Sequence, residues 1–151
     1  MKLKKKGAPE KVGRKPAVGE RKALRKRIVL SNNNALEVPG LREMDEDLLN
    51  DQTTQGMMLA LPEAVVDSLR AIEAFKVTQG WHLFRRPATL VRKETLQLAQ
   101  ILGDSKIAVA KETRRMLLAG ERACGKSTLA LQTMAAAFIK GWIVINLPDG
   151  S

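Results

Sequence analysis

Residues 120–127 read Gly-Glu-Arg-Ala-Cys-Gly-Lys-Ser, which is the GxxxxGKS pattern of a Walker A phosphate-binding loop. Such a loop turns backbone N–H groups inward around a phosphate, and glycine permits this conformation. We expect Gly120 to let the chain leave a strand sharply and Gly125 to let the backbone approach phosphate as a helix begins. A chance match recurs in on the order of one chain in a hundred or fewer. The pattern therefore predicts nucleotide binding.

The side chains of the loop have separate expected roles. Lys126 would reach the β and γ phosphates, the Ser127 hydroxyl would bind Mg²⁺, and Thr128 would lie near the α phosphate. Cys124 sits at a helix start, where a thiolate is stabilised, but the sequence favours a small residue that fills the loop. The predicted nucleotide-binding residues are Gly120, Glu121, Arg122, Ala123, Cys124, Gly125, Lys126, Ser127 and Thr128.

The segments that flank the loop predict an α/β fold. The apolar run 116–119 has strand length, a helix is expected from Lys126 to about Lys140, and 142–147 is expected to form a second buried strand. Strand, loop, helix and strand make one parallel βαβ unit with a right-handed crossover. We therefore assign 106–151 to the start of a P-loop NTPase domain. Hydrolysis also needs a Walker B acid and a residue that positions water, and Asp149 follows the second strand too closely for that role. We expect nucleotide binding without efficient hydrolysis.

Residues 28–105 predict a mainly helical region ahead of this domain. Pro62 suits a helix start, and Val65, Leu69 and Ile72 recur at helical spacing, so a helix is expected over 62–79 with Gly80 as its end. A second helix is expected over 92–102. The linker 81–87 between them is basic and amphipathic, and it would either cover an edge of the core or contact RNA.

The net charge of +10 is concentrated at the N-terminus. Residues 1–27 hold 12 Lys or Arg and 2 Glu, which leaves 14 basic and 14 acidic residues in the rest of the chain. The glycines, prolines and scarce apolar residues of this basic arm predict disorder in isolation. Its charge favours a nucleic-acid partner, with a flexible solubilising tail as the alternative. The expected RNA contacts are Arg21, Lys22, Arg25, Lys26, Arg27, Arg85 and Arg86.

Several functional classes find no support in the composition. Cys124 is the only cysteine, so an intrachain disulfide and a cysteine-based zinc site are excluded. No apolar run approaches the roughly 20 residues that span a bilayer, so we expect no membrane insertion. His82 is the only histidine and has no partner at metal spacing, and the acidic stretch 43–47 lacks the spacing of a Ca²⁺ loop. That stretch is expected to form a solvated face.

The chain resembles the death-associated-protein family of mitochondrial small-subunit ribosomal proteins. The resemblance lies in the Walker A loop extended to Thr128, the helix that follows it, and residues 141–149, which read Gly-Trp-Ile-Val-Ile-Asn-Leu-Pro-Asp. The fungal branch is the most similar, with further likeness at 16–32, 75–81 and 84–87. The resemblance implies a structural component of the mitochondrial small ribosomal subunit, located in its head and in the mitochondrial matrix. It implies an AAA-like P-loop domain that binds GTP or GDP with Mg²⁺ and turns over slowly or not at all. Its implied partners are rRNA and other small-subunit proteins.

Two departures from that family carry expectations of their own. The family usually has glycine where this chain has Ala123, and an alanine with positive φ would cost roughly 1–2 kcal/mol, about five- to thirtyfold in affinity. The family also continues beyond residue 151, so the chain resembles the front part of a longer protein, with a presequence expected upstream of Met1. The loop alone does not distinguish guanine from adenine, so ATP stays open. The alternatives are a P-loop ATPase or small-molecule kinase fragment, and a nucleic-acid-binding fragment whose loop is a relic.

Overall fold

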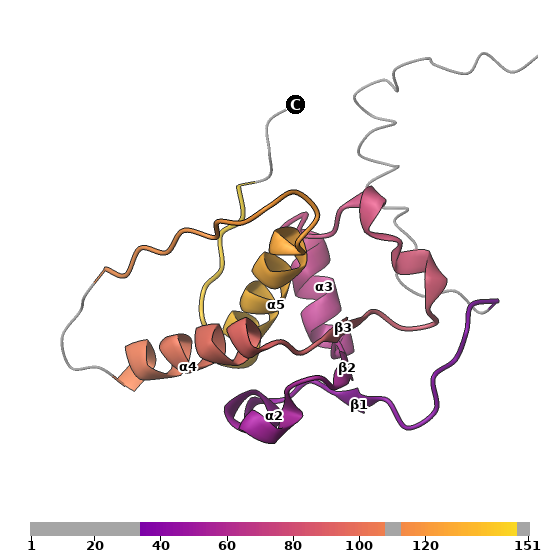
Figure 1. The fold of residues 1–151 in the computed structure, drawn as a ribbon, viewed down its shortest axis with the longest axis horizontal. Helices are drawn as coiled ribbons and strands as arrows, with labels where there is room; N and C mark the ends of the chain where they lie inside the picture. Colours follow the sequence, from indigo (N-terminus) through magenta and orange to yellow (C-terminus); the bar gives the residue numbers. More distant parts are fainter. Residues whose placement is uncertain (1–33, 108–112, 148–151) are drawn as a thin grey trace, which may run out of the picture.

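Helices and a small sheet make a mixed α/β fold in the computed structural model, which describes residues 34–107 and 113–147 apart from the side chains of Val77 and His82 (Figure 1). The basic arm, with all of its predicted RNA contacts, lies outside these residues. The strands are β1 (Arg42–Glu43), β2 (Met58–Ala60) and β3 (Ala88–Leu90). The helices are α2 (Glu46–Asn50), α3 (Glu63–Ala71), α4 (Lys93–Ile107) and α5 (Lys126–Ile139), with short 3₁₀ turns at Gln52–Thr54, Val77–Gln79 and Trp81–Leu83.

The sheet has the order β1-β2-β3, with β1 parallel and β3 antiparallel to the central strand. Arg42 lies opposite Leu59 in the parallel pair, and Leu59 lies opposite Thr89 in the antiparallel pair. The chain between β1 and β2 contains α2, as a parallel connection requires a crossover. Leu59 and Ala60 are fully buried, so the central strand forms one wall of the core.

The core lies where α5 packs against α3 and α4, while α2 packs against α4 and α5 (Figure 1). A single hydrophobic cluster includes Leu49, Leu69, Leu96, Leu131 and Ala135, which come from all four of these helices. Alanine at 135 gives α5 a small side chain at the contact, which permits close helix packing. The cluster thus draws residues from both sides of the expected boundary at 105/106, which stays a prediction.

Helix α3 is shorter than the predicted helix over 62–79, and that prediction was wrong. The helix ends at Ala71, where Glu73 takes a left-handed φ of 57°. The Glu73 N–H donates to Arg70 O at 3.1 Å and the Ala74 N–H to Leu69 O at 3.0 Å, which is the Schellman pattern. This turn buries Phe75, whose ring meets Trp81 edge-on at 5.1 Å. Tertiary burial therefore ended the helix before Gly80.

Helix α4 is longer than expected at its end, while α5 confirms its prediction. Gly103 stays inside α4, which continues to Ile107. Helix α5 covers Lys126–Ile139, against an expected span of Lys126 to about Lys140. Among the described helices none is both long and apolar enough to cross a bilayer.

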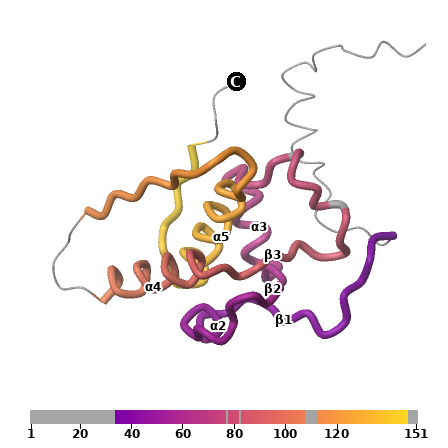
Figure 2. The backbone as a smooth tube through the Cα atoms, viewed as in Figure 1, coloured from indigo at the N-terminus to yellow at the C-terminus, as the bar shows by residue number. Residues whose placement is uncertain are grey.

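The two strands of the predicted βαβ unit do not form, and this is the main correction to the expected fold. Residues 113–121 and 142–147 run as extended chain without a strand, one leading into α5 and the other leaving it (Figure 2). Residues 113–120 are exposed, and Ile143 and Ile145 are 93% and 82% exposed. A strand requires hydrogen bonds to a neighbour, and parallel strands are usually covered on both faces. Within the described residues, strand pairing involves β1–β3 and an isolated bridge between Leu36 and Phe84.

Candidate nucleotide-binding site

The predicted loop is a tight turn in which three residues have positive φ. The values are 150° at Gly120, 65° at Ala123 and 84° at Gly125, which is the N-cap of α5. A Cβ atom at position 120 would lie 3.0 Å from Cys124 Sγ, so the cysteine side chain would have to shift by a few tenths of an ångström. Ala123 therefore has the positive φ at which an alanine was expected to cost free energy.

The first turn of α5 offers backbone donors at the end of this loop. Gly125 provides no side-chain hydrogen bond to the helix start, and the first N–H groups of an α-helix have no partner within the helix. These groups also carry the positive end of the helix dipole. Since α5 is 14 residues long, its start has the electrostatic character that phosphate binding requires.

Lys126 places its cation against the inner carbonyls of the loop. Its Nζ donates to Gly120 O at 2.9 Å and to Glu121 O at 2.5 Å, and it lies 3.5 Å from Cys124 Sγ. These contacts bend the side chain back over the loop that precedes it. Ser127 follows with an exposed side chain and Thr128 with a half-buried one. The structure thus brings three of the other predicted residues, Gly120, Glu121 and Cys124, to the Lys126 ammonium group.

An arginine that the sequence did not point to holds the other side of the loop. Arg92 lies between β3 and α4, and its guanidinium donates to Cys124 O and to Gly125 O, each at 3.1 Å. The contact joins residues 32 and 33 positions apart. No spacing rule signals such a pairing, because an arginine after a strand usually lies on a solvated surface.

Arg85 and Arg86, predicted to contact RNA, lie in ion pairs on the sheet side. Arg85 pairs with Glu37 and Arg86 with Glu43, and roughly half of each arginine side chain is exposed. They border a groove of about 500 Å³ whose apolar walls include Leu36. Each cation therefore has a carboxylate beside it, which lowers the positive charge presented to a polyanion.

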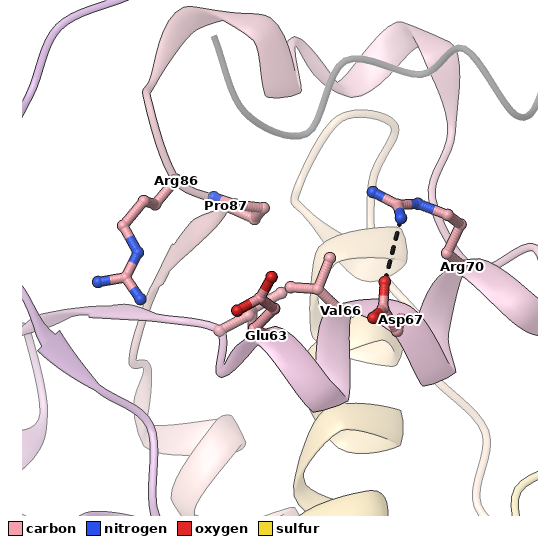
Figure 3. Close-up of a pocket in the computed structure, with 7 residues that line it drawn as sticks. Glu63, Val66, Asp67, Arg70, Arg86 and Pro87 are labelled. Atoms are coloured by element: carbon pink, nitrogen blue, oxygen red, sulfur yellow. Dashed lines mark hydrogen bonds and ion pairs between the residues drawn. The ribbon is translucent and has the colours of Figure 1, made fainter. Parts of the chain in front are cut away.

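A second hollow, of about 260 Å³, lies at the start of α3 (Figure 3). Its charged lining consists of Glu63, Asp67, Arg70 and Arg86. Arg70 and Asp67 pair at 3.1 Å, so acids and arginines balance there and give no surplus of positive charge. The loop at 120–127, whose carbonyls accept hydrogen bonds from Lys126 and Arg92, is the better candidate for an anion site.

Two residues of the acidic stretch 43–47 make contacts that stabilise the fold. Asp45 accepts the Leu48 N–H at 2.7 Å and so caps α2, and Glu46 lies 3.3 Å from the buried Lys140 Nζ. Within the described residues no group of three or more His, Cys, Asp or Glu side chains could hold a metal ion.

Comparison with known proteins identifies the family. Residues 89–151 match the family model described as mitochondrial ribosomal death-associated protein 3. Over 138 residues the chain is 51% identical to the small ribosomal subunit protein mS29 of Neurospora crassa, an alignment that covers 91% of this chain and 29% of that protein. The chain thus spans less than a third of the length of this relative. The resemblance to the mitochondrial ribosomal death-associated protein 3 family and the mitochondrial location that it implied are therefore confirmed.

Proposed function

We propose that the chain is part of a structural component of the mitochondrial small ribosomal subunit that binds a guanine nucleotide and Mg²⁺ through residues 120–128. The observation that carries the nucleotide proposal is the position of Lys126, whose Nζ contacts Gly120 O and Glu121 O at the mouth of a loop with three positive φ angles. A lysine ammonium group and the N-terminus of a long helix both attract the negative charge of phosphate groups, and here they lie together.

Each part of the loop has a role in this proposal. The backbone N–H groups at the start of α5 and the Lys126 ammonium would bind phosphate oxygens, and the exposed Ser127 hydroxyl would bind Mg²⁺. The nucleotide would act as a structural ligand that orders the loop, in an AAA-like P-loop domain where 116–119 and 142–147 pair with further strands. The preference for guanine comes from the family resemblance, because phosphate contacts are the same for GDP and ADP.

Membership of the ribosome is supported by the similarity to a relative that is a small ribosomal subunit protein. The basic arm adds a physical reason, because 12 of the 26 Lys and Arg residues lie within residues 1–27 and would neutralise RNA phosphates. Arg85 and Arg86 are the additional RNA contacts that we propose, provided that phosphate displaces the carboxylates of Glu37 and Glu43. Other small-subunit proteins would be the remaining partners.

Titration with fluorescently labelled GDP in the presence of Mg²⁺ tests the nucleotide proposal. We expect saturable binding by the parent chain, with unlabelled GDP competing better than ADP. Lys126→Ala removes a charged donor worth about 1.5–3 kcal/mol, so affinity should fall about ten- to a hundredfold. Lys93→Ala is the matched control, because Lys93 is an exposed lysine at the start of α4. Failure of the parent chain to bind, or equal affinity of Lys126→Ala and the parent, would refute the proposal.

Sedimentation tests the ribosomal proposal. An epitope-tagged copy of the chain expressed in fungal mitochondria should migrate with the small subunit on a sucrose gradient at low salt. Raising the salt should release a copy that lacks residues 1–27 before it releases the intact one, because the arm supplies the phosphate contacts. Migration of the tagged chain only at the top of the gradient would contradict the assignment.

A further inference from the structure

Arg92 makes a two-pronged contact with the phosphate-binding loop. Its Nη1 donates to Cys124 O and its Nη2 to Gly125 O, both at 3.1 Å. Two parallel donors in a fixed plane distinguish arginine from lysine, whose ammonium is a point charge on a flexible stem. The contact therefore constrains the orientation of two successive peptide groups as well as their position.

The orientation of those peptide groups decides where the loop's N–H donors point. In a trans peptide the C=O of one residue and the N–H of the next lie in one plane and point in opposite directions, and the described residues contain no cis peptide bond. Holding the carbonyls of Cys124 and Gly125 against Arg92 therefore directs the N–H groups of Gly125 and Lys126 away from the guanidinium. These are donors at the unpaired start of α5.

The space around Gly125 is shaped by the same contact. A Cβ atom at this position would lie 3.2 Å from Arg92 Nη1, and the residue has a φ of 84°. The backbone conformation thus favours glycine at 125, and a side chain there would also push against the guanidinium.

A buried hydrogen-bond chain fixes Arg92 relative to α5. The Arg92 N–H donates to Thr95 Oγ1 at 3.1 Å, Thr95 Oγ1 donates to Gln132 Oε1 at 2.8 Å, and Gln132 Nε2 donates to Leu90 O at 2.7 Å. Thr95 and Gln132 are 2% and 0% exposed, and buried polar groups joined in this way are held firmly. The backbone of Arg92 is therefore joined to α5, the helix that follows the loop, by buried hydrogen bonds.

We propose that Arg92 is a positioning residue that preorganises the phosphate-binding loop by directing the N–H groups of Gly125 and Lys126 toward the bound phosphate. The inference rests on the proposed nucleotide binding. Arg92 lies outside the Walker A pattern, so the proposal gives a role in nucleotide binding to the segment between β3 and α4.

Three variants separate positioning from charge. Arg92→Gln removes the charge and the fork, Arg92→Lys keeps the charge without the fork, and Lys93→Gln removes a charge at the next residue, which is exposed. We expect both Arg92 variants to bind labelled GDP about tenfold more weakly than the parent, and Lys93→Gln to bind like the parent. The matching structural readout is the ¹⁵N order parameter of the Gly125 and Lys126 amides, expected to fall from about 0.85 toward 0.6 in both Arg92 variants.

Every outcome of this experiment bears on the inference. Parent-like order parameters and affinity in Arg92→Gln would overturn it, and full rescue of both by Arg92→Lys would assign the effect to charge and overturn positioning. If the parent binds no GDP, the proposed function fails, and the order parameters alone then decide whether Arg92 organises the loop. If circular dichroism shows that Arg92→Gln is unfolded, Arg92→Lys decides, since it keeps the charge and an aliphatic stem.

Discussion

The substitution Ala123→Gly should relieve strain that is visible in the loop. Ala123 has a φ of 65°, and an L-residue in this region costs roughly 1–2 kcal/mol that glycine does not. Glycine also raises the conformational entropy of the unfolded chain, which lowers the stability of the folded state by about 0.4–1 kcal/mol. The net gain is therefore about 1 kcal/mol, equivalent to about a fivefold change in an equilibrium constant.

The gain in free energy appears as higher folding stability or as higher GDP affinity, depending on whether residue 123 has a positive φ with or without bound nucleotide. If the loop holds a positive φ at all times, the unfolding free energy rises and the melting temperature increases by about 2–4 °C. If it does so only around a nucleotide, GDP affinity rises by up to about fivefold. Calorimetry on the parent and the variant measures both quantities, and their sum is the predicted number.

Ala119→Gly is the matched control for this experiment. It makes the same exchange in the same exposed segment, and Ala119 is not among the described residues with positive φ. It should give no gain in either quantity. If Ala123→Gly is neither more stable than the parent nor tighter in GDP binding, the strain argument is wrong.

Three further predictions follow from the loop, the arm and the core. The chain should release no phosphate from GTP or ATP at an appreciable rate, because Lys126 and Ser127 supply contacts but no described residue activates water; turnover of order one per second that Lys126→Ala abolishes would contradict this. If about six cations of the arm contact single-stranded RNA, the logarithm of the RNA-binding constant should fall against the logarithm of the salt concentration with a slope near −4. Deleting residues 1–27 should remove most of that slope. An unchanged slope would place the RNA contacts elsewhere in the chain. Lys140 is 2% exposed, and its Nζ donates to Glu46 and Asn50. In urea titrations Lys140→Ala should lower the unfolding free energy of the protein by about 2 kcal/mol and Lys140→Met by less than about 1 kcal/mol, because methionine keeps the buried stem. Equal losses in the two variants would show that the charge matters more than the packing.

Local chemistry predicted the loop well. The Walker A spacing located the start of α5 at Lys126, and the positive φ on which the expected cost of alanine at 123 depended is present, at 65°. These features depend on residues that are neighbours in sequence, where turn and cap preferences operate.

Features that depend on distant partners were missed or wrong. The apolar runs 116–119 and 142–147 have strand composition, but a strand forms only with a hydrogen-bonded neighbour, which the described chain does not place beside them. The helix predicted over 62–79 ends early because the chain turns after Ala71 and packs the Phe75 ring against Trp81. Arg92 reaches the loop across 32 residues, a distance at which sequence spacing carries no information.

The extended segment 142–147 has a consequence for handling the protein. Trp142, Val144 and Asn146 turn toward the body, where Asn146 Nδ2 donates to Ile72 O at 3.0 Å. The opposite face presents an alternating row of apolar side chains, with Ile143, Ile145 and Leu147 at 93%, 82% and 88% exposed. An unpaired segment of high β-propensity is a template for pairing with another copy. Preparations of the isolated chain should therefore self-associate as concentration rises, and Ile145→Lys should keep them monodisperse without disturbing the inward face.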